Sequence, residues 1–451
     1  MTMHQLTTYQ SEIARAVLDS VLNERGLTFT VEIARGGGVR ELSAQIEHLL
    51  LTLHLNDGAN LLRIAPPGSA DTRERVVDAL QDSALHGLWS AERKSVRLGR
   101  STLRFLTTDE LDPTVLQHGL GLIEVADAQL VSEHIFGSWI RPLGDTAGAT
   151  TVLYGQPLNG ETPFELTKQR NREIEVRDGI TRHFRVAYDE VALAIPEFAH
   201  DMAEANARLG SEHPEFQSAY LLRPTIDGAP LLAADCLSAL ESGYRTHQPS
   251  GSGGIVASVV ATRLPEAEPT RAAPLFGTPM ATAVITIAER SPAPKPNGGL
   301  HVVEHRWVEA IDAGMLARRV AKVLAEWQPV RTAAEDGTGH GEAFRDALNQ
   351  AMGFTPIAWV RNDMASIARR LSDLLAALHT GRLTTYRFDG SPEHRALRHE
   401  LASAQIDYAP GPCTMSVPAG EEGFLRGLML IVRTTVAGQR PTEFAETALA
   451  S

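Results

Sequence analysis

The chain has 451 residues and a mass of 48.8 kDa, which predicts two or three domains because a single hydrophobic core rarely extends that far. It carries 55 acidic against 42 basic residues and a formal net charge of −13, so any contact with nucleic acid must be local. Hydrophobic residues make up 43% and charged residues 22%, which excludes wholesale disorder, a coiled coil or a collagen. A two-domain enzyme or motor fits this size, whereas a small binding module does not.

The cysteines and the apolar segments indicate the compartment. Cys236 and Cys413 are too few for a disulfide framework or a four-cysteine metal site, and we interpret them as core-like thiols in a reducing environment. The first twenty residues lack the basic and then apolar pattern of a signal peptide. No apolar run approaches the roughly 18 residues of a membrane-spanning helix. We therefore expect a protein of the cytoplasm without a membrane partner.

The N-terminal part of the chain alternates between helix and strand patterns. Residues 10–23 have apolar side chains at helical spacing, residues 27–34 are typical of a strand, and residues 41–55 again follow a helical stripe. A glycine cluster, Gly36 to Gly38, separates the last two segments. Further short strands are expected at residues 61–64, 121–125 and 150–154, joined by helical connections. This order predicts a parallel α/β sheet.

The C-terminal part begins differently, with consecutive strands. Residues 170–215 are charged and helical in pattern, and the Ser- and Gly-rich residues 242–254 are the expected domain border. Beyond them we expect strands at residues 255–261, 282–288 and 301–308, followed by helices at residues 313–326 and 342–352. An arginine-rich amphipathic helix at residues 368–382 has either a solvated charged face or a DNA-contacting one. A second mixed α/β domain is predicted.

The glycine cluster permits phosphate binding but does not establish it. A loop between a strand and a helix can hold phosphates with its backbone N–H groups at the helix N-terminus. A working P-loop also needs a lysine on the phosphates and a hydroxyl on Mg²⁺, whereas Val39 and Arg40 follow Gly38 here. From these residues alone, a generic strand-to-helix turn and a phosphate-binding loop both remain open.

Several segments taken in order are more specific. TTYQSEIARAVLDS, VEIARGGGVRELSA, GLIEVADAQ and TTVLYGQP, then TAVITIAE, DGTGHGEAF and EEGFLRGLML, resemble successive motifs of the large subunit of tailed-phage terminases. The resemblance implies an α/β protein with an N-terminal P-loop (ASCE-type) ATPase-like domain and a C-terminal RNase H-like nuclease-like domain. The expected borders are residues 1–185 for the ATPase-like domain, 186–245 for a helical linker and 246–451 for the nuclease-like domain.

The resemblance also implies the residues of the nucleotide site. Asp127 takes the position of the catalytic glutamate, Val39 that of the P-loop lysine, and Ala126 that of the Mg²⁺-binding aspartate. ATP and Mg²⁺ are the cofactors that the family implies, although these replacements put their binding in doubt. The nucleotide-binding positions carried over from the family motifs are Tyr9, Gln10, Arg35, Gly37, Gly38, Arg40 and Gly155.

The nuclease motifs are changed in the same way. The first acidic position falls on Ile255 or Val256, and a second one falls on Ala281. Asp336 remains as a candidate catalytic and metal-binding acid, and Glu422 is a candidate partial substitute at the closing motif. Two-metal cleavage needs several clustered carboxylates, so the resemblance implies an impaired nuclease.

Three functions follow from this pattern. The first is a terminase-like protein of the viral DNA packaging machinery, impaired in both ATP hydrolysis and DNA cleavage. The second is an active packaging motor and endonuclease with compensating residues, such as Arg40 for the missing lysine. The third is a structural or interaction protein of phage head assembly. The family implies double-stranded DNA, a portal and a small terminase as partners, with a possible homo-oligomer in the host cytoplasm.

Overall fold

The computed structural model describes residues 6–436 except 70–71, 86, 113–119, 159, 226–227, 233–236, 239, 244, 250–252, 265–280, 291–298, 337–340, 354, 408–413 and 418–422. The chain forms two compact units. The N-terminal unit comprises Met1–Ala205 and Pro214–Ile226, and the C-terminal unit comprises Asn206–His213 and Asp227–Ser451. No helix in the described ranges is long and apolar enough to cross a membrane.

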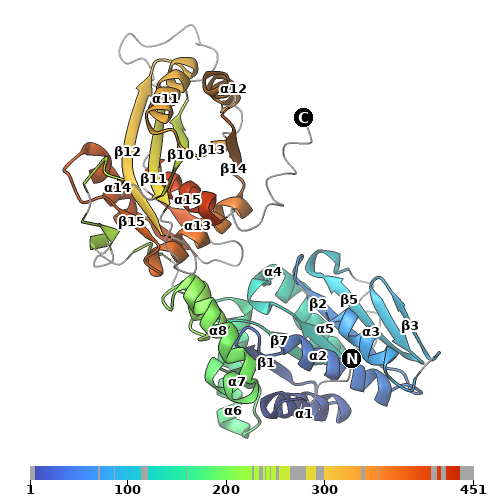
Figure 1. The fold of residues 1–451 in the computed structure, drawn as a ribbon. Helices are drawn as coiled ribbons and strands as arrows, with labels where there is room; N and C mark the ends of the chain where they lie inside the picture. The colour runs from blue at the N-terminus through green and yellow to red at the C-terminus, as the bar shows by residue number, and fades with distance from the viewer. Residues whose placement is uncertain are drawn as a thin grey trace. The chain divides into compact units, whose positions relative to one another are not determined.

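The N-terminal unit is built on an eight-stranded sheet with the order β3-β4-β5-β2-β6-β7-β1-β8 (Figure 1). The neighbouring strands β5, β2, β6, β7, β1 and β8 run parallel to one another. At the other edge, β3 pairs with β4 and β4 pairs with β5 in antiparallel fashion. The four strands expected from the apolar runs are confirmed as β1, β2, β6 and β7, whereas β3, β4, β5 and β8 were not expected. The bounds are β1 Thr28–Ile33, β2 Asn60–Ala65, β3 Trp89–Glu92, β4 Ser95–Leu98, β5 Ser101–Thr107, β6 Leu122–Val125, β7 Thr150–Tyr154 and β8 His183–Val186.

Helices connect these parallel strands, as the alternating pattern predicts. The first helix, α1, begins after Thr7, whose hydroxyl and Gln10 form a reciprocal capping box that satisfies free N–H groups of the first turn. Apolar side chains of β2, β6, β7 and α6 form one buried cluster on this sheet. The helices are α1 Thr8–Leu22, α2 Val39–Leu53, α3 Arg73–Gln81, α4 Glu133–Ile135, α5 Arg141–Ala147, α6 Pro163–Asp178, α7 Tyr188–Ala194, α8 Pro196–Leu209 and α9 Pro214–Ala219, with short turns η1 Thr108–Glu110, η3 Ala128–Leu130 and η4 Phe136–Ile140.

The C-terminal unit has a six-stranded sheet with the order β14-β13-β10-β11-β12-β15. Its three long strands β10, β11 and β12 are antiparallel and consecutive, and β13 then joins β10 in parallel. The three strands predicted at the start of this unit are confirmed. The strand bounds are β10 Gly254–Arg263, β11 Ala281–Arg290, β12 Leu300–Ala310, β13 Arg331–Asp336, β14 Ile357–Arg361 and β15 Leu383–Thr385, and a small second sheet holds β9 Ala229–Pro230, β16 Gln405–Asp407 and β17 Thr414–Ser416.

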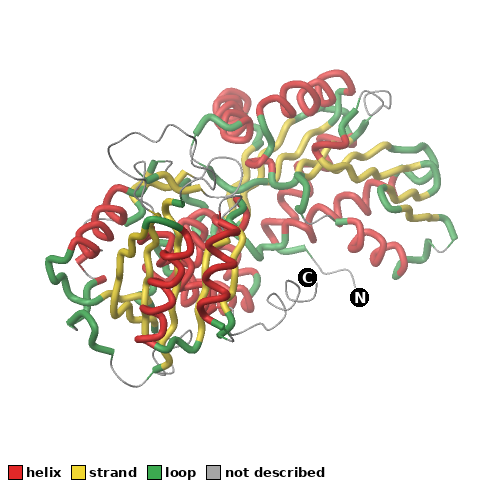
Figure 2. Tube along the Cα trace, turned by 90° about the horizontal axis from the view of Figure 1, so that it is seen from above, coloured by secondary structure: helices red, strands yellow, loops and turns green. Residues whose placement is uncertain are grey.

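Helices cover both faces of this larger sheet (Figure 2). The two predicted helices, α11 Ala313–Trp327 and α12 Gly341–Met352, lie on one face. The helices α13 Met364–His379, α14 Pro392–Ser403 and α15 Gly423–Val436 lie on the other. Helix α15 approaches the sheet closely because it presents glycine there. A Cβ atom at Gly427 would lie 2.6 Å from Thr286 Oγ1, and one at Gly423 would lie 2.6 Å from Thr262 Cγ2. Both units therefore have the predicted mixed α/β class.

Candidate functional site

A cavity of about 1290 Å³ lies in the N-terminal unit, where the parallel strands β1, β2, β6 and β7 reach their carboxyl ends. In open α/β sheets this edge is the usual ligand site, because the loops that follow the strands can converge there. The residues that line it are Thr7, Gln10, Ile33, Ala34, Arg35, Gly36, Gly38, Val39, Arg40, Glu41, Gln45, Arg63, Pro67, Gly68, Ser69, Ala126, Asp127, Gln129, Leu130, Tyr154, Gly155, Gln156, Ala194, Ile195, Pro196 and Glu197.

The glycine loop enters this cavity in a conformation that needs glycine. Gly36 and Gly38 have φ angles of 91° and 79°, in the left-handed region. A Cβ atom on Gly37 would lie only 2.5 Å from Ile33 Cγ2. Helix α2 begins at Val39, and no side chain caps its N-terminus. The first turn of α2 therefore offers backbone N–H groups and the positive end of the helix dipole at the cavity.

Tyr9 and Gln10 hold the loop through its carbonyl groups. The Tyr9 hydroxyl donates to the Gly37 carbonyl at 2.8 Å, and Gln10 Nε2 donates to the Gly38 carbonyl at 3.1 Å. The Gln10 side-chain oxygen accepts from the Thr7 N–H at 2.9 Å. Burial raises the pKa of Tyr9, which therefore stays a donor. Gln10 lines the cavity, whereas Tyr9 is not among the lining residues and supports the loop.

The cations of the loop differ in their contacts. Arg35 lines the cavity but forms an ion pair with Glu215, with 2.5 Å between Arg35 Nη1 and Glu215 Oε1. Arg40 is exposed on the first turn of α2, and its side chain has no ion pair within the part of the chain that the structure describes. Glu41 is bound by Arg75, at 2.6 Å. Arg40 is thus the cation of this loop that remains available to a ligand.

The segment after β6 places Ala126 and Asp127 in the cavity wall. Asp127 has a left-handed backbone, with φ 45° and ψ 44°, which costs a non-glycine residue about 1 kcal/mol. Backbone outliers of this kind are concentrated at functional sites, so the conformation supports a role for this carboxylate. Ala126, which the resemblance places at the position of the metal-binding aspartate, contributes a methyl group to the cavity wall.

A buried guanidinium lies at the floor of the cavity, and the sequence analysis did not anticipate it. Arg63 on β2 is 2% exposed, and its Nη1 lies 3.6 Å from Glu47 Oε1 on α2 and 3.7 Å from Glu124 Oε2 on β6. Nη1 also donates to Ser43 Oγ. The guanidinium carbon lies 5.9 Å from the centre of the Tyr154 ring, within cation–π range.

The carboxylates around Arg63 are both buried. Burial, followed by the proximity of Glu124, raises the pKa of Glu47 well above its ordinary value. The Tyr154 hydroxyl donates to Glu124 Oε1 at 2.7 Å, and burial raises the pKa of Tyr154 as well. Glu47 and Glu124 therefore lie at similar distances from one buried guanidinium.

The residues of this cavity do not fit the Mg²⁺ that the family implies. Among the lining carboxylates, Glu41 is engaged by Arg75, and Asp127 and Glu197 remain. Glu124 faces Arg63, which lines the cavity while Glu124 does not. The described parts of the chain hold no group of three or more His, Cys, Asp or Glu side chains that could bind a metal ion. At nucleotide sites Mg²⁺ usually keeps several waters and takes one or two protein carboxylates, and here Ala126 stands where the resemblance expects the metal-binding aspartate.

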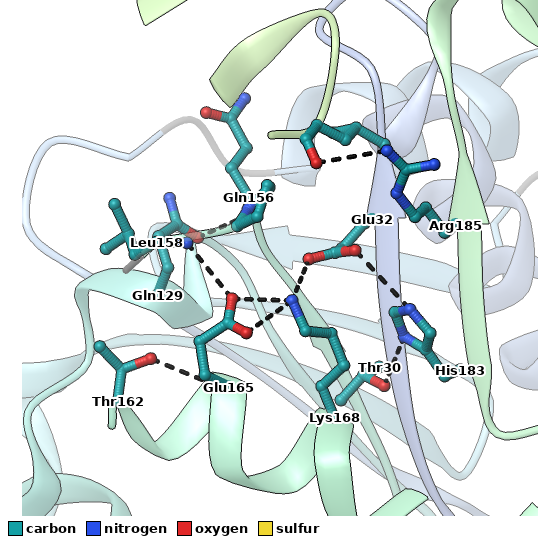
Figure 3. Close-up of polar contacts among 12 residues, drawn as sticks. Thr30, Glu32, Gln129, Gln156, Leu158, Thr162, Glu165, Lys168, His183 and Arg185 are labelled. Carbon is teal, nitrogen blue, oxygen red and sulfur yellow. Dashed lines mark hydrogen bonds and ion pairs between the residues drawn. The ribbon is translucent and has the colours of Figure 1, made fainter. Parts of the chain in front are cut away.

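The loop after β7 is fixed by a second buried network (Figure 3). Gln129 Oε1 accepts from the Gln156 N–H at 3.1 Å, and Glu165 Oε1 accepts from the Leu158 N–H at 3.2 Å. Lys168 Nζ lies 2.6 Å from Glu165 Oε2 and 2.8 Å from Glu32 Oε1. The network therefore ties α6 and the C-terminal end of β1 to the loop beside the cavity.

Two features of this network follow from burial. Burial raises the pKa of Glu32, although Lys168 opposes this, and burial lowers the pKa of His183, beside Glu32, to about 3.

Gly155, at the start of the loop, is closely packed. A Cβ atom there would lie 2.8 Å from Phe164 Cζ and 3.0 Å from Gln129 Oε1.

The C-terminal unit presents its acids at the end of β13. Asp336 forms an ion pair with Arg345 on α12, with 3.3 Å between Oδ1 and Nη1, and both side chains are about one-third exposed. Its neighbour Glu335 is buried and is bound from two helices. Arg370 Nη1 of α13 lies 3.0 Å from Glu335 Oε1, and Arg426 of α15 is hydrogen-bonded to Glu335 Oε2.

The other expected acidic positions are apolar or outside the described residues. Val256 is buried in the cluster beneath α15, Ile255 packs against the opposite cluster, and Ala281 is fully buried there. Glu422 lies outside the described residues. On the central strand β10, Ser258 donates to the Gly427 carbonyl at 2.8 Å. The structure thus places Asp336 beside Arg345, and the described residues hold no group of three or more His, Cys, Asp or Glu side chains that could bind a metal ion there.

The sequence did contain a signal for the buried pairs. Glu32, Arg63, Glu124 and Glu335 are charged residues inside strands that pair in parallel with both neighbours, where both faces are normally buried. A charge at such a position requires a partner. The identity of the partner comes from other elements and is not evident from local sequence.

Comparison with known proteins supports the fold. No family model and no curated protein matches the chain in sequence. The large terminase of a thermophilic bacteriophage superimposes with a TM-score of 0.61 and 11% sequence identity, over 96% of this chain and 100% of that chain. The same terminase in complex with ADP gives a TM-score of 0.57 at 10% identity, over 96% of this chain and 100% of that chain. In complex with ATP-γ-S it gives a TM-score of 0.55 at 9% identity, over 95% of this chain and 99% of that chain.

The chain is therefore a large-terminase-like protein in fold. The predicted resemblance and the predicted fold class, an ATPase-like unit followed by a nuclease-like unit, are confirmed at this level.

Proposed function

We propose that this chain is a phage large-terminase-like component of a viral DNA packaging machine whose ATPase and nuclease sites are both impaired. The fold supports the packaging role by analogy with the large terminase of the thermophilic bacteriophage. We further propose that it acts in the host cytoplasm, with double-stranded DNA, a portal protein and a small terminase as partners, in a homo-oligomer.

One observation carries the impairment. Asp336, the candidate metal-binding acid at the end of β13, is paired with Arg345, and its neighbour Glu335 is held by Arg370 and Arg426, so both acids at this strand end have guanidinium partners in place of a divalent cation. An adjacent cation site would place metal charge against these arginines. Asp336 alone cannot hold two cations that repel each other, and it is already paired with Arg345.

The nucleotide site supports the same proposal. Val39 offers no ammonium to the phosphates, Ala126 offers no metal ligand, and Arg63 lies against Glu124. Each missing electrostatic group is typically worth a factor of about 10² or more in rate. Hydrolysis at background level follows, even though the loop and the cavity are retained.

The proposal is tested with the purified full chain, double-stranded plasmid, ATP and either Mg²⁺ or Mn²⁺. DNA binding is followed by fluorescence anisotropy, and cleavage and phosphate release are followed in the same samples. DNA binding without cleavage or turnover supports the proposal. Cleavage or turnover above a protein-free blank contradicts it.

A second candidate, an active motor with compensating residues, is favoured by two observations. Asp127 has a strained backbone in the cavity wall, and Arg40 is a free guanidinium one position after Val39 within the described residues. Arginine binds phosphate well, although it cannot replace a metal-binding carboxylate. Phosphate release that is lost in both Asp127→Asn and Arg40→Ala would favour this candidate.

A further inference from the structure

Part of the Ser- and Gly-rich segment that precedes β10 is docked on the C-terminal unit. The Ser242 N–H donates to the Thr385 carbonyl at the end of β15, at 2.8 Å. Further along the chain, the Thr246 hydroxyl donates to Asp389 Oδ2 at 2.6 Å. Residues 242–247, of which 244 lies outside the described residues, thus form a strap along the β12–β15 side of the six-stranded sheet.

The strap ends at a bulge in β12. The pairing of β12 with β11 shifts at Val303, which lies between the paired residues Val302 and Glu304. The His247 N–H donates to the Val303 carbonyl at 3.0 Å and so supplies a hydrogen bond to the bulge. His247 has a φ angle of 61°, in the left-handed region that a non-glycine residue adopts only at a cost. Contacts of its side chain must therefore hold it in place.

The His247 ring has two such contacts. It stacks on the Trp327 ring of α11, with the ring centres 6.3 Å apart and the planes at 14°. Its Nδ1 lies 3.5 Å from Glu304 Oε2 on β12. The His247 side chain is 56% exposed, whereas that of Glu304 is 3% exposed. The imidazole can therefore exchange its proton with water while it faces a buried carboxylate.

The charges around this ring favour a further cation. Arg306 Nη2 lies 2.6 Å from Glu304 Oε1, and Arg306 Nη1 lies 2.9 Å from Glu326 Oε2 on α11. The Trp327 indole N–H also donates to Glu304. Among the described residues, two carboxylates thus share one guanidinium here, and an imidazolium would balance the second carboxylate. Arg245 on the strap is exposed, so water and salt screen its effect on the ring.

We propose that His247 makes the strap responsive to pH: its protonated ring holds the strap on the sheet through Glu304, and loss of the proton loosens the strap. An imidazole changes its charge between about pH 5 and pH 8. The charged ring gains its carboxylate partner only when the strap is docked. Docking is therefore strongest at the acidic end of this range and weakens as the pH rises. This device lies in the C-terminal unit and does not depend on the proposed loss of catalysis.

The test is hydrogen exchange of the full chain, measured by mass spectrometry between about pH 5.5 and pH 8 and corrected for the intrinsic exchange rate at each pH. The informative peptide contains His247, whose N–H is hydrogen-bonded in the docked strap. Its protection factor should fall about threefold as the pH rises, as expected for one partly exposed ion pair. Protection that stays constant, or that increases with pH, overturns the proposal.

A general loosening of the unit in acid cannot produce this result. Burial lowers the pKa of His305 in the same unit to about 3, so protonation of His305 destabilises the fold as the pH falls. That effect would reduce protection in acid, which is opposite to the direction expected for the strap.

His247→Gln separates this histidine from the others. The variant keeps a polar side chain that cannot become charged, so the protection of the strap should no longer depend on pH. His200→Gln is the matched control, because His200 is an exposed histidine on α8 in the N-terminal unit, and it should keep the threefold change of the parent. The same pH dependence in all three proteins would overturn the proposal.

Glu304→Gln tests the partner of the imidazolium. In this variant Arg306 and Glu326 balance each other, so a protonated ring gains no uncompensated carboxylate and the pH dependence should disappear. Because Glu304 is buried, folding is checked first by circular dichroism. A folded Glu304→Gln with the threefold change of the parent contradicts the proposal, and if the variant does not fold, the comparison of His247→Gln with the parent decides.

Discussion

Arg63 and Glu124 lie opposite each other on the adjacent strands β2 and β6, with 3.7 Å between Nη1 and Oε2. Arg63 lines the cavity of the N-terminal unit. Glu335 in the C-terminal unit is likewise bound by arginine, from α13 and α15. In both units a buried carboxylate near the expected chemistry is neutralised by the protein's own guanidinium. An internal cation of this kind is always present, whereas a metal ion must bind from solution.

Restoring the missing groups should restore a response to metal. Val39→Lys with Ala126→Asp places an ammonium and a carboxylate at the two positions that the family motif requires. We expect ATP affinity to increase about tenfold on addition of Mg²⁺, because the metal then has a protein ligand. Calorimetric titration with and without Mg²⁺ measures this.

The control for this pair is Val39→Lys with Ala126→Asn, which has nearly the same size but no added negative charge. It should show no gain from Mg²⁺. If the Asp variant is folded and also shows no gain, our assignment of Val39 and Ala126 to these motif positions is wrong.

The buried pair between Arg370 and Glu335 should be important for stability. Arg370→Met leaves Arg426 as the remaining ion-pair partner of Glu335 among the described residues, and it should lower the free energy of unfolding by about 3 kcal/mol. Arg345→Met breaks the pair with Asp336, which is about one-third exposed, and should cost less than about 1 kcal/mol. Urea unfolding of the full chain, followed by circular dichroism, compares the two. Equal losses would mean that the Glu335 cluster has no special role in the C-terminal unit.

The stability of the C-terminal unit should fall in mild acid because of His305. Its side chain is buried between Tyr386 and Phe424, and burial lowers its pKa to about 3. His394 opposes the proton further, and Asp389 favours it. The unfolded chain takes up this proton near pH 6.5. The stabilising contribution of neutral His305 is therefore fully present above about pH 6.5 and is lost as the pH falls toward about 3.

His305→Phe should remove part of that acid sensitivity. We expect the urea midpoint of the variant to fall less than that of the parent between about pH 7 and about pH 5, since one fewer buried group must be protonated. His200→Gln, a change at an exposed histidine on α8, is the control and should leave the pH dependence of the parent unchanged. A parallel pH dependence in all three proteins would exclude His305 as the cause.

The sequence predicted the architecture well because the architecture depends on local patterns. The apolar runs of β1, β2, β6, β7 and the long strands of the C-terminal unit were evident, and so was the glycine loop before α2. The β3–β4 hairpin was missed because its strands have four residues each. β8 was missed because it has four residues, two of them charged or ionisable, inside a segment with a helical charge pattern.

The candidate sites were only partly predictable, for a different physical reason. Sequence motifs located Asp127, Arg40 and the glycines at the cavity, because those residues follow strand ends. The partners of Arg63 come from α2 and β6, and those of Glu335 come from α13 and α15. Arg370, which the sequence assigned to an arginine-rich face, is 1% exposed in this cluster. Such long-range pairings depend on tertiary packing, which periodicity does not reveal.

The Asp336 carboxylate should be dispensable for DNA binding. The full chain should fail to cut plasmid DNA in Mg²⁺ or Mn²⁺, and Asp336→Ala should change the dissociation constant for duplex DNA by less than about twofold, because the affinity would come from arginines. Asp336→Asn, which removes the charge but keeps the shape, is the matched control. Cleavage by the parent that disappears in both variants would show that a working metal site includes Asp336.

The most direct test of the account is the rate of phosphate release from ATP by the full chain with Mg²⁺ and double-stranded DNA, compared with Asp127→Asn. Asp127 lines the cavity, and it is the acid that the resemblance places at the position of the catalytic glutamate. The account predicts that the parent and the variant release phosphate at the same rate as a protein-free blank. Release by the parent well above the blank, abolished in Asp127→Asn, would contradict it.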